Sequence, residues 1–175
     1  MQGLVVSLTL DDITLEIAKL HQAGEMGFTQ SGRAHGMVAL IQPDGSVGAV
    51  IPFSPAARPP SDEVITMRAR ENGAVGLSLT GEYWTNPDPL SRQQVQLDPH
   101  DLPVPNSLPP ERRGEQIITT AVLRGHDHVL RITTPISRSV FGNSLGERAT
   151  FHDDAPMQAG EARHLITLLH AAAQR

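Results

Sequence analysis

The arrangement of apolar segments along the 175 residues predicts a single α+β domain with a mainly antiparallel sheet, made of two hairpins and a central strand. Two observations carry this prediction. β-Branched segments occur in pairs around short polar turns, and three other segments have apolar residues at three- and four-residue steps. Hairpins outnumber crossover units, which disfavours a parallel doubly wound sheet. We therefore expect about three helices packed on one side of an antiparallel sheet.

The first segment with helical spacing begins at Asp11 and Asp12, either of which can accept hydrogen bonds from the free amides of a helix start. Gly24 and Gly27 are predicted to end this helix, because glycine adopts the left-handed conformation common at helix ends. The residues that form its one-sided apolar stripe are Leu10, Ile13, Ile17 and Leu20.

The first hairpin is predicted where residues 37–41 and 47–53, both rich in β-branched side chains, flank a short polar segment. Asp44 and Gly45 suit the positive φ angles of a tight turn between two strands. Residues 54–60 contain three prolines, which lack the amide hydrogen that a strand ladder needs, so the second strand should end there.

Between the two hairpins the sequence predicts one helix and the central strand. Ser61 is placed to cap a helix that runs to about Asn72. Residues 74–80 then alternate large and small side chains, so another element is expected to pack closely on the small face. The residues expected on the buried side of the helix are Val64, Ile65, Arg68 and Ala69.

The second hairpin is predicted from residues 116–123 and 129–134, which turn through a polar segment containing Gly125. Residues 135–156 show no clear period and are expected to be irregular. Aliphatic residues then recur at helical spacing, which predicts a last helix over residues 160–173.

Residues 86–113 are predicted to form one long excursion from the single domain, which otherwise spans residues 1–175. Half of the 14 prolines fall in this segment. Proline removes backbone donors, so the segment should not join the sheet as an ordinary strand. Its scattered aliphatic residues are too numerous for a free linker. We expect it to pack on the protein or on a second copy of it.

Composition excludes several classes of protein. The chain has no cysteine, so a disulfide scaffold and a thiolate site are excluded. It has no apolar run of the roughly 20 residues that a membrane helix needs, and no basic leader segment, so we expect a cytoplasmic protein. Nineteen acidic residues against fourteen basic ones give a net charge of −5, which makes nucleic acid an unfavourable partner.

Residues 69–84, ARENGAVGLSLTGEYW, resemble a segment of a family of uncharacterised bacterial and phage proteins. In that family a helix leads through Gly-Ala into a strand that ends in Glu-x-Trp, and Tyr83 stands where Ala is usual. Residues 110–115, PERRGE, are similar to the Pro, Arg and Glu that precede a later strand of the family. The resemblance implies the placement of strand and loop, and the family has no assigned activity.

The end of the central strand is the first candidate binding site. Glu82, Tyr83 and Trp84 stand there, and they include the only Tyr and the only Trp of the chain. A carboxylate beside aromatic surface can bind a ligand or exchange a proton. The simpler interpretation is that Trp84 covers the edge of the core while Glu82 pairs with an arginine, such as Arg112 or Arg113, and we favour it.

A metal site is the alternative chemistry. His126 and His128 are two positions apart, so on a strand both imidazoles would lie on the same face. Asp153 or Asp154 could add the carboxylate of a site suited to zinc or iron. The expected hairpin turn at residues 124–128 favours solvated histidines instead.

Two further patterns do not support catalysis. Gly142, Ser144 and Gly146 match the G-x-S-x-G pattern of a hydrolase, but only 31 residues follow Ser144, too few for the rest of a triad scaffold. We expect a Gly- and Asn-rich loop there. Four other histidines are expected to be solvated or to make one hydrogen bond each: His21, His35, His164 and His170.

The sequence as a whole predicts a non-enzymatic binding or assembly domain without a cofactor. We expect it to bind a protein partner or to form a homo-oligomer. The contact surface would involve the strand end at Glu82–Trp84 and the Pro-rich excursion. The alternative is a small metal-dependent hydrolase that uses His126, His128 and one of the two aspartates.

Overall fold

A computed structural model describes residues 7–54, 59–85, 114–153 and 160–174. The Pro-rich segment 86–113, with Arg112 and Arg113, and Asp154 lie outside the described residues. The helices are α1 (Leu10–Ser31), α2 (Asp62–Glu71) and α3 (Gly160–Ala173). The strands are β1 (Gly36–Ile41), β2 (Val47–Phe53), β3 (Gly76–Thr85), β4 (Gly114–Leu123), β5 (Val129–Ser139), β6 (Gly142–Leu145) and β7 (Ala149–Asp153).

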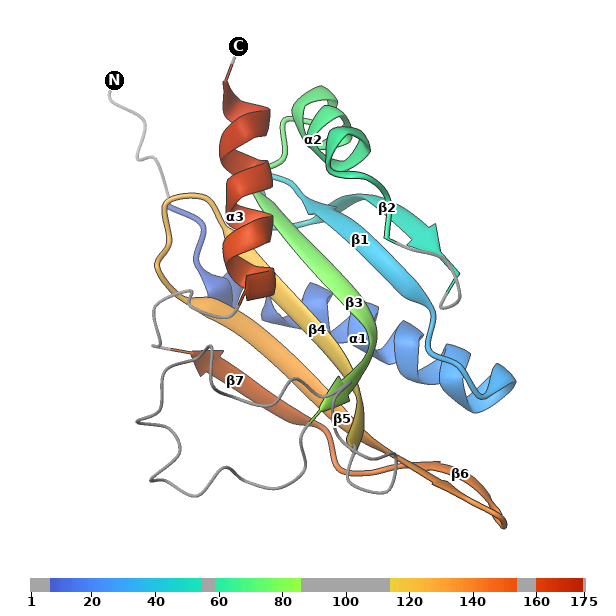
Figure 1. The fold of residues 1–175 in the computed structure, drawn as a ribbon. Coiled ribbons are helices and arrows are strands. Elements are labelled where there is room, and N and C mark those ends of the chain that lie inside the picture. Colours follow the sequence, from blue (N-terminus) through green and yellow to red (C-terminus); the bar gives the residue numbers. More distant parts are fainter. Residues whose placement is uncertain (1–6, 55–58, 86–113, 154–159, 175) are drawn as a thin grey trace, which may run out of the picture.

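All seven described strands join one antiparallel sheet in the order β2-β1-β3-β4-β5-β6 (Figure 1). The outer edge of β5 is shared by two strands: β7 pairs with its first half and β6 with its last four residues. This topology confirms the α+β prediction, including both hairpins and the central strand. Among the described helices, none is long and apolar enough to cross a membrane.

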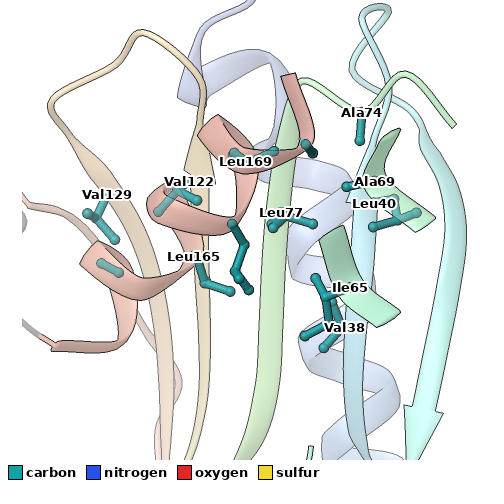
Figure 2. Packing of buried hydrophobic residues seen from close by; sticks show 13 residues of the cluster. Val38, Leu40, Ile65, Ala69, Ala74, Leu77, Val122, Val129, Leu165 and Leu169 are labelled. Atoms are coloured by element: carbon teal, nitrogen blue, oxygen red, sulfur yellow. The ribbon is translucent and has the colours of Figure 1, made fainter. Parts of the chain in front are cut away.

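The helices cover both faces of the sheet, so the expectation that they share one side was wrong (Figure 1). α1 packs against β4 and β5 on one face. On the other face, Figure 2 shows Leu165 and Leu169 of α3 over Leu77 and Val122, while Ile65 of α2 lies next to Val38. A sheet with apolar residues on both faces needs both covered, because either face would otherwise leave large side chains in water.

The limits of α1 differ from the prediction at both ends. Thr9 caps the helix in a reciprocal arrangement with Asp12, and Gly32, with a φ of 74°, ends it. Gly24 and Gly27 lie inside the helix and are buried. A Cβ at Gly24 would lie 3.1 Å from Thr80 Cγ2, and one at Gly27 would overlap the His35 ring. These glycines therefore let the helix approach its neighbours closely and do not end it.

The first hairpin is confirmed, with a correction in its turn. Gly45 has a φ of 83°, whereas no residue other than glycine has a positive φ among those described, so Asp44 does not share that conformation. The Asp44 carboxylate instead accepts hydrogen bonds from the amide of Ser46 at 2.9 Å and from its hydroxyl. Asp44 thus stabilises the turn through its side chain.

In α2, Ser61 is the cap as predicted, and its hydroxyl accepts a hydrogen bond from the amide of Val64. Ile65 and Ala69 are buried, but Val64 and Arg68 are exposed, so only half of the predicted buried side is correct. Gly76, on the small face of the central strand, allows a close approach to the neighbouring strand: a Cβ there would lie 2.7 Å from the carbonyl oxygen of Val122.

Residues 135–156 were expected to be irregular, and this prediction was wrong for the part that the structure describes. β5 continues to Ser139, and β6 and β7 follow it. Ser137, Asn143 and Ser144 are exposed although they are in strands, because these strands lie at the edge and tip of the sheet. Without a buried face they carry no apolar alternation, which removes the usual signal of a strand.

Candidate functional site

The candidate site lies where β3 extends beyond its neighbour β1. The last pair between these strands joins Met37 to Thr80, whereas β3 continues along β4 as far as the pair of Thr85 with Gly114. Beyond Thr80, β3 is therefore paired with β4 on one side, and no described strand pairs with its other side. This step in the sheet places Glu82, Tyr83 and Trp84 at one corner of the molecule.

A cavity of about 300 Å³ opens at this step. Its base contains Gly36 and Gly81. A Cβ at Gly36 would overlap the Phe53 ring, and one at Gly81 would lie 3.2 Å from the Tyr83 ring. The glycines therefore allow two aromatic rings to lie directly on the strands. Among the described residues, the cavity is lined by Arg33, Ala34, Gly36, Phe53, Pro59, Gly81, Glu82, Tyr83, Trp84 and Glu115.

Glu82 is held by three groups. Its Oε1 accepts a hydrogen bond from Arg138 at 2.7 Å, and Arg33 lies 3.6 Å from the same oxygen. Its Oε2 accepts the backbone N–H of Ala34 at 3.1 Å. The Glu82 side chain is only 10% exposed. A carboxylate so enclosed needs these partners, because an unpaired buried charge is costly.

Arg138 joins two carboxylates across three strands. It donates to Glu82 on β3 and to Glu115 on β4, and a further N–H donates to the carbonyl oxygen of Gly32 at 2.9 Å. Its guanidinium lies 5.1 Å from the centre of the Phe28 ring. A planar guanidinium can form all these contacts at once, which a lysine cannot. The two carboxylates thus share one arginine of the β5–β6 hairpin, and Arg33 adds a second positive charge beside Glu82.

The two aromatic side chains of the strand end differ in role. Burial, with the nearby carboxylate of Glu161 as a further cause, raises the pKa of the Tyr83 hydroxyl, which therefore remains protonated. Trp84 is 47% exposed at the rim of the cavity. Tyr83 closes the wall towards α3, and Trp84 offers the cavity an apolar surface that water still reaches.

The sequence predicted an arginine partner for Glu82 and named Arg112 and Arg113. These two residues lie outside the described part of the chain. The partners that the structure does show, Arg138 and Arg33, were missed. Arg138 stands 56 residues from Glu82 in the sequence and two strands away in the sheet, so only the strand order reveals the contact.

The corner at the other end of β5 holds the residues of the metal hypothesis. His126 and His128 lie in the turn between β4 and β5, and the pairing of Val129 with Asp153 brings β7 next to that turn. Among the residues described, no three His, Asp or Glu side chains are grouped so that they could hold one metal ion. Asp154 is outside the described residues, and the metal site stays a prediction.

Ser144 lies within β6, opposite Ser137 of β5, and is exposed. A nucleophile elbow needs its serine on a sharp turn from a strand into a helix. Here the segment is one strand of a hairpin, so the match to G-x-S-x-G has no corresponding geometry.

A second polar cluster, which the sequence did not predict, surrounds His21 inside the molecule. His21 is fully buried on α1, with Nδ1 2.9 Å from Thr119 Oγ1 and Nε2 2.8 Å from Thr134 Oγ1. It therefore makes two hydrogen bonds, and the expectation of a solvated or singly bonded histidine was wrong. Thr80 extends the cluster through a contact of 2.8 Å with Thr119.

The direction of the hydrogen bonds in this His21 cluster follows from Glu25. Thr134 donates to Glu25 Oε1 at 2.6 Å, so its oxygen must accept from His21 Nε2–H. Nδ1 is then the acceptor of the neutral imidazole, and Thr119 donates to it. Burial opposes ionisation of Glu25, but hydrogen bonds from Arg148 and Thr134 outweigh this and lower the pKa of the carboxyl. Burial lowers the pKa of His21 to about 4.

Comparisons of the chain with models of protein families, with curated proteins and with solved structures find no match. The resemblance of residues 69–84 to bacterial and phage proteins stays an expectation from the sequence. What the site does must therefore be argued from its own geometry.

Proposed function

We propose that this chain is a non-enzymatic binding or assembly domain whose contact surface includes the strand end at Glu82–Trp84. The observation that carries the proposal is the combination of an aromatic cavity with carboxylates that are already paired with arginine. Glu82 and Glu115 both accept hydrogen bonds from Arg138. The half-exposed ring of Trp84 forms part of the cavity rim. Aromatic surface beside satisfied polar groups is typical of binding sites.

The same contacts argue against acid–base catalysis at this corner. A general acid or base must exchange a proton during the reaction, and its pKa should lie near the working pH. Burial raises the pKa of the Tyr83 hydroxyl further above that range. Glu82 is enclosed by Arg138, Arg33 and the amide of Ala34. Breaking these contacts to bind and protonate a substrate would expose the arginine charges, which opposes catalysis there.

Site-specific photocrosslinking tests the proposal. A benzoylphenylalanine is introduced at Arg33, whose side chain is 66% exposed at the cavity, and in a control protein at Leu15, which is 68% exposed on α1. In the cells that make the protein, we expect a discrete crosslinked product from position 33 and none from position 15. The product should become much weaker when the chain that carries the crosslinker at position 33 also carries Trp84→Ala.

Two results would contradict a binding function at this surface. One is an equal yield of products from both positions. The other is a product whose yield the added Trp84→Ala change leaves unchanged. In either case the strand end would not be the contact surface.

A further inference from the structure

The most exposed apolar residues described in this chain stand together at one hairpin tip. Val140 and Phe141 join β5 to β6 and are 95% and 97% exposed. The turn is held in shape, because Ser139 Oγ accepts the N–H of Phe141 at 3.2 Å and donates to the carbonyl oxygen of Gly142 at 3.1 Å. Two adjacent apolar side chains on a rigid, solvent-exposed turn indicate an interaction site, because such a patch is normally covered by another apolar surface.

The strand-end cavity has the properties that such a tip requires. Its rings come from Phe53, Tyr83 and Trp84, and the first two lie directly on the backbone of Gly36 and Gly81. A cavity of about 150 Å³ is enough to hold benzene. The volume of about 300 Å³ therefore accepts the ring of a phenylalanine with space for a second, smaller side chain. Val140 and Phe141 provide such a pair.

The tip and the cavity belong to the same end of the sheet. Figure 1 shows the β5–β6 hairpin reaching past the end at which β3 stops and β1 starts. Arg138, which pairs with Asn143 near the tip of this hairpin, contacts both carboxylates beside the cavity. Within one copy the tip does not fill the cavity, since Phe141 is almost fully exposed.

Resting on the proposed binding function, we propose that the partner is a second copy of this chain. In the two-fold dimer, the Val140–Phe141 tip of each copy enters the strand-end cavity of the other. One insertion buries about 150–250 Å² for the phenylalanine, well below the roughly 800 Å² per partner of a stable interface. Two reciprocal insertions at one end, with the rim between them, bring the buried area towards that value. Two-fold closure also prevents the open chains that a one-way contact would build.

The first measurement is the mass of the purified protein by light scattering between about 1 μM and about 1 mM. We expect twice the monomer mass of 18.9 kDa at the upper end. Phe141→Ser should raise the dissociation constant of the dimer by about a hundredfold or more, because two buried rings are lost. Leu15→Ser, at an exposed site of α1, is the control and should leave the constant unchanged. Phe141 is almost fully exposed, so its replacement leaves the fold intact.

Mixing two variants tests the reciprocal geometry. Phe141→Ser lacks the tip and keeps the cavity, whereas Trp84→Ser keeps the tip and lacks the cavity rim. Each variant alone should be monomeric at a concentration where the unmodified protein is dimeric. The mixture should associate more tightly than either variant alone, because it restores one of the two insertions. A dimer that survives Phe141→Ser, or a mixture that associates no more tightly than either variant alone, overturns the proposal.

The remaining outcomes separate this proposal from the binding function itself. A chain that is monomeric up to about 1 mM overturns the dimer. If the crosslinker at position 33 then still yields a product with a different protein, the strand end binds another partner and the binding function stands. Flotation of the monomer with phosphatidylcholine vesicles, lost in Phe141→Ser, would instead assign the tip to a lipid surface and also overturn the dimer. Failure of the crosslinking comparison overturns both.

Discussion

The stability of the domain should fall as the pH is lowered from 8 to 5, and His21 should be the main cause. His21 is buried as a neutral imidazole with a pKa of about 4, whereas in the unfolded chain the value returns to 6.5. As the pH falls through 6.5, His21 binds a proton in the unfolded chain, whereas in the folded protein it does so only near pH 4. Stability is therefore fully present above pH 6.5 and is lost between these two values.

The size of the effect follows from the difference between the two pKa values. The full loss is about 3 kcal/mol, reached near and below pH 4, and about 2 kcal/mol of it is lost by pH 5. This is a large fraction of the roughly 5–15 kcal/mol that stabilises a typical domain. The carboxyl groups whose pKa is lowered stay ionised over the same range, so they add little to the change between pH 8 and pH 5: Asp12, Glu25 and Asp44.

Urea unfolding measures the effect, followed by circular dichroism at constant ionic strength and at several pH values. The Phe141→Ser background removes any contribution of self-association. His21→Gln keeps one donor and one acceptor but cannot titrate, so its stability should change by less than about 0.5 kcal/mol over the same range. His170→Gln, at an exposed position of α3, should retain the full dependence. A flat profile in the unmodified protein, or an equally steep one in His21→Gln, would refute the reasoning.

Three further predictions concern the sheet, the carboxylates and the metal hypothesis. Gly76→Ala should lower the free energy of unfolding by about 1–3 kcal/mol, since its Cβ would lie 2.7 Å from the carbonyl oxygen of Val122; an unchanged urea midpoint would contradict this. Arg138→Gln should cost about 2 kcal/mol, because it leaves two carboxylates without their cation, and Glu82→Gln should recover part of that loss in the double variant. Arg33→Gln is the matched control and should cost less than about 0.5 kcal/mol. Protein made without a tag should hold well under one equivalent of zinc, iron or manganese by elemental analysis; a full equivalent that is lost with His126→Ala and His128→Ala would favour the hydrolase.

Elements whose signal is local were predictable from the sequence. The first hairpin combines β-branched strands with Gly45 in its turn, and α3 has an apolar stripe throughout its length. Gly24 and Gly27 were misinterpreted because a glycine that allows close packing looks the same in sequence as one that ends a helix. The edge strands β6 and β7 were missed because they bury no face.

The site was only partly predictable, for a different reason. Glu82, Tyr83 and Trp84 stand together in the sequence, so the strand end could be recognised. The partners of Glu82 and of His21 are distant in the chain: Arg138 is 56 residues from Glu82, and Thr134 is 113 residues from His21. Their contacts depend on the order of the strands and on which face α1 covers. Neither is encoded in a local pattern.

Charged contacts hold the β5–β6 hairpin to the domain in addition to the apolar packing of Ile136 and Leu145 against Phe28 and Ile117. Arg138 ties one strand of the hairpin to Glu82, Glu115 and the end of α1, and Arg148, just beyond the other strand, pairs with Glu25. Both guanidinium groups are about one-third exposed, so dissolved ions reach them. At 1 M salt the screening length falls to about 3 Å, which weakens these ties, whereas salts that are excluded from protein surfaces strengthen apolar burial. Ionic strength therefore acts in opposite directions on the two kinds of contact that hold the hairpin, weakening its ion pairs under conditions that strengthen its apolar packing.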